Sequence, residues 1–315
     1  MRFLVTGGCG FAGSHLVGEL LSQGHQVTVM DNLTYAGLLR NLAHLSGFKL
    51  VHHDFSQSLK PESTLFDYVI HNGAESHVLR SLEAPGKFVQ SNVIGTLNLL
   101  EWARQHGCIK KFVYVSTDEV FGPAGDESYH EGDRLCPTNP YSATKAAGEF
   151  LVRAYFRSFG LPALITRTGN MFGERQHYEK FVPKIIGQVL GGETVDIHCQ
   201  SHYKGGPPDD ICNRMWLYVG EQAKALVWLA EYGEPGKAYH VSEGTSKCVL
   251  TMASTIAGIL GRDLTYRLVC VDGDLGYKIS TKGTPEHKNW DLTNQFEALF
   301  VKTVLWYRDH SEFLS

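Results

Sequence analysis

Tyr141 and Lys145 are the two side chains whose types and spacing most directly indicate acid–base chemistry. They stand four residues apart in Tyr-Ser-Ala-Thr-Lys, inside a helix predicted over residues 139–158. On a helix this spacing places both side chains on one face, about one turn apart. An ammonium beside a phenol favours the phenolate, so we expect Lys145 to lower the pKa of Tyr141 and make it a general base. Such pairs also occur by chance on solvated helices. The motifs upstream must therefore show whether this pair has a function.

A second polar group stands at the end of a predicted strand. Ser116, Thr117, Asp118 and Glu119 follow the apolar strand predicted over residues 110–115. A hydroxyl and two adjacent carboxylates at the carboxyl edge of a sheet suit proton transfer. The same residues would equally suit a solvated strand end with an Asp turn.

The N-terminal glycines have the order that a dinucleotide-binding turn requires. A strand over residues 1–6 runs into Gly7, Gly10 and Gly13, and a helix over residues 14–22 follows. These glycines permit a tight turn, close approach of a pyrophosphate and close packing of the helix, whose N-terminus favours negative charge. Asp31 ends the next strand, where an acid binds the ribose hydroxyls and repels a 2′-phosphate. We therefore expect NAD rather than NADP, with Asp54 near the adenine.

Strand and helix patterns alternate through the first half, which predicts an α/β, Rossmann-like, doubly wound parallel sheet. Strands are predicted over residues 26–30, 49–52, 67–71, 110–115 and 161–166, and a long helix over 88–105. After Arg167 the alternation loosens, with a helix over 179–190, a strand over 194–198, an irregular loop over 202–210 and a last helix over 293–310. We expect one domain over residues 1–166, to which 216–232 return, and a smaller mixed α/β domain over 167–315.

Composition excludes several classes of protein. The 29 basic and 33 acidic residues give a net charge of −4, without the basic cluster that a nucleic-acid partner would need. The seven cysteines are scattered and form no Cys-x-x-Cys, which argues against a metal site or a disulfide framework. No run is long enough to span a bilayer, and the apolar start is too short for a signal peptide. We expect a cytoplasmic protein with no membrane partner.

Several motifs together resemble the extended short-chain dehydrogenase/reductases that act on nucleotide sugars, and most closely the dTDP-glucose 4,6-dehydratases. The resemblance covers almost the full chain. Its most selective part is Thr117-Asp118-Glu119, because related epimerases lack the acid pair. The other matching segments are Thr6 to Ser14, Ala74 to Val78 with Arg80-Ser81, Ser91 to Thr96, Pro137 to Lys145, Glu179-Lys180 with Pro183, Trp216 to Val219, and Thr303 to Tyr307.

The resemblance implies a reaction in three stages. Tyr141, with Lys145 and Thr117 nearby, takes the proton of the sugar 4-hydroxyl while hydride passes from C4 to NAD. Glu119 then removes the acidified C5 proton as Asp118 protonates the departing 6-hydroxyl. Hydride then returns to C6 and a proton returns to C5, giving a 4-keto-6-deoxy sugar and bound NAD. Two adjacent carboxylates suit these roles because like charges push their pKa values apart, leaving one protonated and the other ionised.

The resemblance also implies which residues bind the ligands. The substrate contacts expected are Ser76, His77, Asn170, Glu179, Lys180 and Arg214. The cofactor contacts expected are Gly7, Gly10, Phe11, Ala12, Gly13, Asp31, Asn32, Asp54, Phe55, Ala74, Asn92, Ser116, Tyr141 and Lys145. A homodimer is expected as well, with the helices over 88–105 and 139–158 of each subunit forming a four-helix interface.

The departures from the family pattern concern the substrate more than the chemistry. Leu79 replaces a usual Asp, Met215 follows Arg214 where an Asp is usual, and the family's Asn-Ile-Gly-Gly reads His240-Val241-Ser242-Glu243. The nucleotide base is therefore left open. The alternatives are a nucleotide-sugar 4-epimerase or decarboxylase, and a non-catalytic NAD-binding regulator on the same fold.

Overall fold

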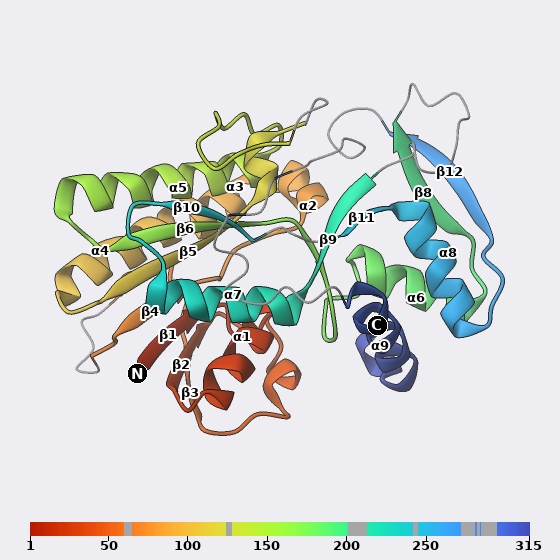
Figure 1. Ribbon diagram of the computed structural model, residues 1–315, viewed down its shortest axis with the longest axis horizontal. Coiled ribbons are helices and arrows are strands. Elements are labelled where there is room, and N and C mark those ends of the chain that lie inside the picture. Colours follow the sequence, from red (N-terminus) through yellow and green to blue (C-terminus); the bar gives the residue numbers. More distant parts are fainter. Residues whose placement is uncertain are drawn as a thin grey trace.

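The computed structural model describes residues 1–59, 65–123, 128–200, 213–241, 245–271, 281, 284 and 295–315. Within them, one parallel sheet has the strand order β10-β6-β5-β4-β1-β2-β3 (Figure 1). Val5 at its centre lies opposite Val29 on one side and Ile70 on the other. The strands are β1 (Arg2–Thr6), β2 (Gln26–Asp31), β3 (Phe48–His52), β4 (Tyr68–His71), β5 (Lys111–Thr117), β6 (Ala163–Thr168) and β10 (Ala238–Val241). The predicted Rossmann-like sheet is confirmed.

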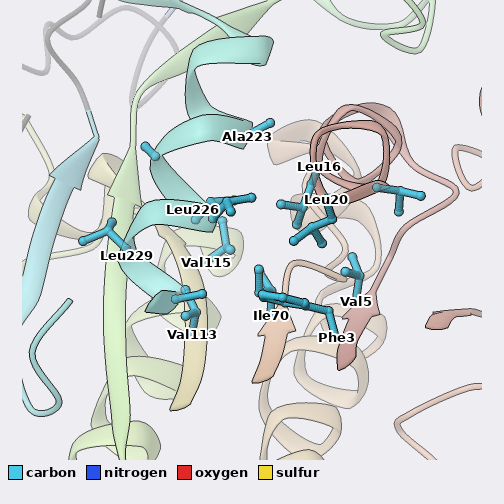
Figure 2. Packing of buried hydrophobic residues seen from close by; sticks show 14 of the residues in the cluster. Phe3, Val5, Leu16, Leu20, Ile70, Val113, Val115, Ala223, Leu226 and Leu229 are labelled. Atoms are coloured by element: carbon cyan, nitrogen blue, oxygen red, sulfur yellow. The ribbon is translucent and has the colours of Figure 1, made fainter. Parts of the chain in front are cut away.

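Helices cover both faces of this sheet because side chains alternate along each buried strand. Phe3 and Val5 of β1 pack in the cluster with α1 (Phe11–Ser22) and α7 (Val219–Tyr232), as Figure 2 shows. Leu4 points the other way, into the cluster with α4 (Gly95–His106) and α5 (Pro140–Phe159). Burial on both faces explains why β1 reads as a continuous apolar run.

The second half builds its own core beside the carboxyl edge of the sheet (Figure 1). Phe172, Trp216 and Phe300 are buried together there. Its sheets have the orders β11-β9-β7 and β12-β8. The elements are β7 (Asn170–Phe172), α6 (Phe181–Gly191), β8 (Val195–Gln200), β9 (Asn213–Tyr218), β11 (Thr245–Cys248), α8 (Val249–Leu260), β12 (Tyr266–Val271) and α9 (Phe296–Asp309).

Three differences from the predicted elements matter for the site. Strand β5 continues to Thr117, so Ser116 and Thr117 lie within the strand rather than after it. The helix predicted over 88–105 is divided into α3 (Pro85–Phe88), a π-helix (Val89–Ile94) and α4. Helix α8 was not predicted.

The domain boundary at residues 166 and 167 stays a prediction. Strand β6 crosses it, and β10, far along the chain, pairs in parallel with β6. Helix α7, within the segment predicted to return, packs on α1 and β5. The irregular loop, Ser242–Glu243 and the start of the last predicted helix lie outside the described residues. In the part of the chain that the structure describes, no helix has the length and apolar character needed to cross a membrane.

Candidate active site

A cavity of about 710 Å³ opens at the carboxyl ends of the parallel strands, where ligands bind in open α/β sheets. It brings together most of the predicted site residues. Those that line it are Gly7, Gly10, Phe11, Ala12, Asp31, Asn32, Asp54, Phe55, Ala74, Ser76, Ser116, Thr117, Asp118, Glu119, Tyr141, Lys145, Asn170, Glu179 and Lys180. Gly13, His77, Asn92 and Arg214 were predicted to bind ligands but are not among its lining residues.

The glycine turn leaves no room for side chains at two of its three positions. A Cβ on Gly13 would lie 2.0 Å from the carbonyl oxygen of Gly7, so helix α1 packs as close to β1 as the backbone allows. Gly7 has φ +67°, and a Cβ there would lie 2.5 Å from Cα of Gly73. Gly10 is the N-cap of α1 and lines the cavity, which leaves the free N–H groups of the first turn beside it.

Asp31 both lines the cavity and holds the glycine turn in place. Its Oδ2 accepts a hydrogen bond from the Cys9 N–H at 2.9 Å, and its Oδ1 accepts one from the Leu33 N–H at 2.8 Å. The sequence predicts only a ribose contact for this carboxylate. The structure adds a second reason for an acid at the end of β2, because the same group fixes the turn that the pyrophosphate would approach.

Helix α5 presents Tyr141 and Lys145 to the cavity from its first turns. Asn139 caps the helix, accepting from the Ser142 N–H at 2.9 Å, and Pro140 is its first residue. Lys145 is buried, and its Nζ donates to the Val115 carbonyl at 2.6 Å and lies 4.4 Å from the centre of the Tyr114 ring. Burial lowers the pKa of Lys145 to about 7, against the opposing charge of Glu149.

The expected lowering of the Tyr141 pKa is not found. Burial raises the pKa of Tyr141, the charge of Glu119 adds to the rise, and a hydrogen bond with Thr117 opposes it. Lys145 is not among the groups that shift this pKa. The helical spacing correctly places both residues on the cavity side of α5. It could not show that the ammonium binds the carbonyl of Val115 while a carboxylate stands near the phenol.

Asp118 and Glu119 form a carboxyl pair with unequal surroundings. Thr117 caps the short 3₁₀ helix Asp118–Phe121, and its Oγ1 accepts from the Glu119 N–H at 3.3 Å. Asp118 is buried, and burial followed by the charge of Glu119 raises its pKa to about 7. Glu119 is less buried, and its Oε2 accepts from Nδ2 of Asn139 at 3.3 Å. Near neutral pH, Asp118 can therefore hold a proton that it can donate.

The substrate residues predicted in the second half lie on separate elements, and two of them, Lys180 and Arg214, interact electrostatically with the carboxyl pair. Nζ of Lys180 donates to the Ser76 carbonyl at 3.1 Å, and Asn170 begins strand β7. The positive charge of Arg214, on β9, lowers the pKa of Asp118 and so partly opposes its rise. Arg214 is therefore close enough to act on the acid pair without lining the cavity.

Asn92 holds two walls of the cavity together instead of lining it. It is buried in the π-helix, and its side chain exchanges two hydrogen bonds of 2.9 Å with the backbone of Glu75. Its Nδ2 also donates to Oγ1 of Thr144, between Tyr141 and Lys145, at 3.0 Å. π-helical turns often occur at functional sites, and here the π-helix orients the side-chain amide of Asn92 toward Glu75 and Thr144.

Sequence reasoning missed several residues of the cavity wall. Tyr35, Gln176, His177, Trp216 and Gln222 also line it. Tyr35 could have been found, because it follows Asp31 in the loop that leaves the cofactor edge of the sheet. The others come from the second half, where neither periodicity nor strand order indicates which loop reaches the cavity.

The residues present fit a dinucleotide. Free N–H groups of α1 and a buried carboxylate at the end of β2 stand along one cavity, beside a glycine turn that has no room for a Cβ at Gly7 or Gly13. Together with the Tyr-x-x-x-Lys helix, they define the class of short-chain dehydrogenases and reductases. The chain belongs to the NAD dependent epimerase/dehydratase family, whose model matches residues 3–242. This confirms the predicted family and its NAD cofactor.

Similar proteins narrow the family further. The dTDP-glucose 4,6-dehydratase of Streptomyces niveus is 35% identical over 98% of this chain and 94% of its own length. A trifunctional UDP-glucose 4,6-dehydratase of Arabidopsis thaliana is 33% identical over 99% of this chain and 47% of that protein. The crystal structure of a dTDP-glucose 4,6-dehydratase from Streptomyces venezuelae with NAD bound has a TM-score of 0.91 and 33% identity, covering 99% of this chain and 98% of that one.

Proposed function

We propose that this protein is a nucleotide-sugar 4,6-dehydratase that converts an NDP-glucose to the NDP-4-keto-6-deoxy sugar. The observation that carries the proposal is the buried Asp118, whose pKa is raised to about 7 beside the carboxylate of Glu119. An epimerase or a decarboxylase needs no such acid–base pair beyond the C4 oxidation. A non-catalytic regulator would need neither the pair nor the Tyr141 helix.

The chain's own residues account for each proton transfer. Tyr141 takes the proton of the sugar 4-hydroxyl, although burial raises its pKa, and its hydrogen bond with the Thr117 hydroxyl opposes that rise. NAD, when bound, supplies the hydride acceptor for C4 and the hydride donor for C6, so it ends each cycle unchanged. The ketone at C4 acidifies the C5 proton, which Glu119 removes. Asp118 gives its proton to the departing 6-hydroxyl, and water leaves. The proton held by Glu119 then returns to C5 as C6 receives the hydride.

dTDP-glucose is the proposed substrate, with UDP-glucose as the other nucleotide to test. The bacterial relative and the solved structure are named for the first, and the plant relative for the second. Lys180, Arg214 and Asn170 are the proposed contacts on the nucleotide side.

The test is to incubate the purified protein separately with dTDP-glucose, UDP-glucose, CDP-glucose and GDP-mannose, without added NAD, and to follow product mass. Loss of one water from a single substrate would support both the dehydratase reaction and the identity of the nucleotide. It would also indicate that the protein keeps NAD bound through purification. A product of unchanged mass would instead indicate an epimerase. Absence of reaction with every substrate, even with added NAD, would overturn the proposal.

We also propose a cytoplasmic homodimer joined through α4, α5 and the π-helix. The support is a group of exposed apolar side chains on these neighbouring elements: Val89, Ile94, Phe150 and Phe159. Exposed apolar surface of this kind is typical of a protein interface. Cys9, Cys108, Cys136, Cys199 and Cys248 are free thiols, in keeping with a reducing compartment.

A further inference from the structure

Arg80 joins two segments of the cavity wall that are far apart in the sequence. Its guanidinium lies 3.9 Å from the centre of the Tyr35 ring, and its Nε donates to Oε2 of Glu179 at 2.9 Å. Tyr35 belongs to the loop that leaves β2 after Asp31, on the cofactor side. Glu179 belongs to the loop before α6, on the proposed substrate side. Both residues line the same cavity, so the Arg80 contacts close its wall between the two sides.

Tyr35 and two histidines also contact Glu179, Tyr35 through a side-chain hydrogen bond. Nδ1 of His177 lies 3.6 Å from Oε1 of Glu179, and Nε2 of His77 lies 3.9 Å from Oε2. The His177 ring also meets the Tyr35 ring edge-on, with centres 5.3 Å apart. Burial lowers the pKa of both histidines, so at neutral pH they are neutral and Arg80 is the cation that pairs directly with Glu179.

The two side chains of the Arg80–Glu179 ion pair differ in exposure, and the exposed one makes the pair sensitive to dissolved salt. The side chain of Glu179 is 12% exposed, whereas that of Arg80 is 44% exposed. Glu179 therefore faces the cavity, and Arg80 covers it from outside. A partly exposed ion pair is weakened by dissolved salt.

We propose that Arg80 is a positioning residue which holds Tyr35 against Glu179 and thereby slows the release of NAD. The cavity cannot widen between the Tyr35 loop and the Glu179 loop until these contacts part. The inference rests on the proposed function, in which NAD is regenerated in every cycle and does not need to leave the protein. Because Arg80 also orients Glu179, a proposed substrate contact, its loss should raise the KM for the sugar nucleotide more than it lowers kcat.

The experiment measures the exchange of bound NAD. Protein purified with NAD is diluted into excess isotopically labelled NAD, and the label that becomes bound is followed by mass spectrometry at low and high salt. The variants are Arg80→Met, which keeps the length and removes the charge, Arg80→Lys, which keeps the charge and removes the planar fork, and Tyr35→Leu. The matched control is Arg104→Met, because Arg104 also contacts a carboxylate, Glu101, and a ring, Phe159, but away from the cavity.

We expect Arg80→Met to exchange NAD about tenfold faster than the wild type, since about 1.4 kcal/mol of contacts is lost. Its exchange should depend on salt less steeply than wild-type exchange, which quickens as salt rises. Arg80→Lys should exchange NAD at a rate between those of Arg80→Met and the wild type, and Tyr35→Leu should also exchange it faster than the wild type. Arg104→Met should exchange it at the wild-type rate. Equal unfolding midpoints would show that the fold is intact.

Two failures are distinguishable. If the wild-type protein neither carries nor takes up NAD, the proposed function is wrong. If it holds NAD but Arg80→Met and Tyr35→Leu exchange it at the wild-type rate, the proposed function stands and the role of Arg80 is overturned. Equal acceleration in Arg104→Met would likewise overturn it.

Discussion

Asp118 and Glu119 are chemically the same kind of group, and only their surroundings can give them different roles. Asp118 is buried beside the like charge of Glu119, and burial followed by that charge raises its pKa to about 7. A carboxyl with its ordinary pKa would carry almost no proton at neutral pH. The site can therefore keep a carboxylic acid protonated near neutral pH, as the proposed elimination of water requires.

The first prediction at this scale distinguishes the proposed roles of the two bases, Tyr141 in oxidation at C4 and Glu119 in removal of the C5 proton. Tyr141→Phe should abolish reduction of bound NAD, because no group takes the 4-hydroxyl proton. Glu119→Gln should reduce the cofactor and then stop, because the C5 proton remains. Single-turnover measurements of cofactor absorbance and product mass check both. Undiminished cofactor reduction in Tyr141→Phe, or normal water loss in Glu119→Gln, would refute the corresponding role.

The second prediction concerns pH. Asp118 acts as an acid only while protonated, so elimination should be fastest below pH 7 and fall about tenfold per pH unit above it. Single-turnover quench experiments that resolve the 4-keto sugar from the dehydrated sugar isolate this step from oxidation, on which Lys145 also acts. Asp118→Asn should be slower and lack this fall. An elimination rate that stays level as pH rises above neutral would contradict the assignment.

At the scale of elements, α5 and β6 are joined by a buried ion pair behind the catalytic helix face. Arg167 donates to both oxygens of Glu149, at 2.9 and 2.7 Å, and its Nη1 donates to the Glu131 carbonyl at 2.9 Å. Both side chains are fully buried. Glu149 follows Lys145 by one helical turn, and its charge raises the Lys145 pKa that burial lowers. The pair thus supports both the packing of α5 and the charge of its lysine.

Removing one partner of this pair should be costly. Arg167→Met leaves the Glu149 carboxylate buried without its main partner, which should lower the free energy of unfolding by about 3–5 kcal/mol. The double variant Glu149→Leu/Arg167→Met should recover much of that loss, because neither charge of the pair is left buried without the other. Urea unfolding of both variants measures the difference. A single variant as stable as the wild type would show that the pair contributes little.

At the scale of the whole molecule, one face of the sheet is covered by helices that keep large apolar side chains in solvent. Phe150 of α5 is 59% exposed, although the same helix presents Tyr141 and Lys145 to the cavity. If two copies pair through this face, Phe150→Asp should give a monomer, because burying a charge at an interface is unfavourable.

Sedimentation analysis would measure that change. Tyr232→Asp is the control, since Tyr232 is 65% exposed on α7, on the opposite face of the sheet. Equal sedimentation of Phe150→Asp and the wild type would contradict an interface at α5.

The sequence by itself determined the parallel sheet, the glycine turn with Asp31, and the positions of Tyr141, Thr117, Asp118 and Glu119. These follow from local rules: burial on both faces makes apolar strands, glycine alone fits the turn, and a helical pitch sets the distance from Tyr141 to Lys145. The carboxyl ends of parallel strands then meet at one edge.

Only the tertiary structure decided which groups surround those side chains and how their pKa values shift. Lys145 binds the Val115 carbonyl, Asn92 bridges Glu75 and Thr144, and Arg80 joins Tyr35 to Glu179. Each of these contacts joins segments from different elements, and the shift of a pKa depends on burial and on such neighbours. Neither can be read from spacing along the chain, because both arise only when the sheet, its helices and the second half close around one cavity.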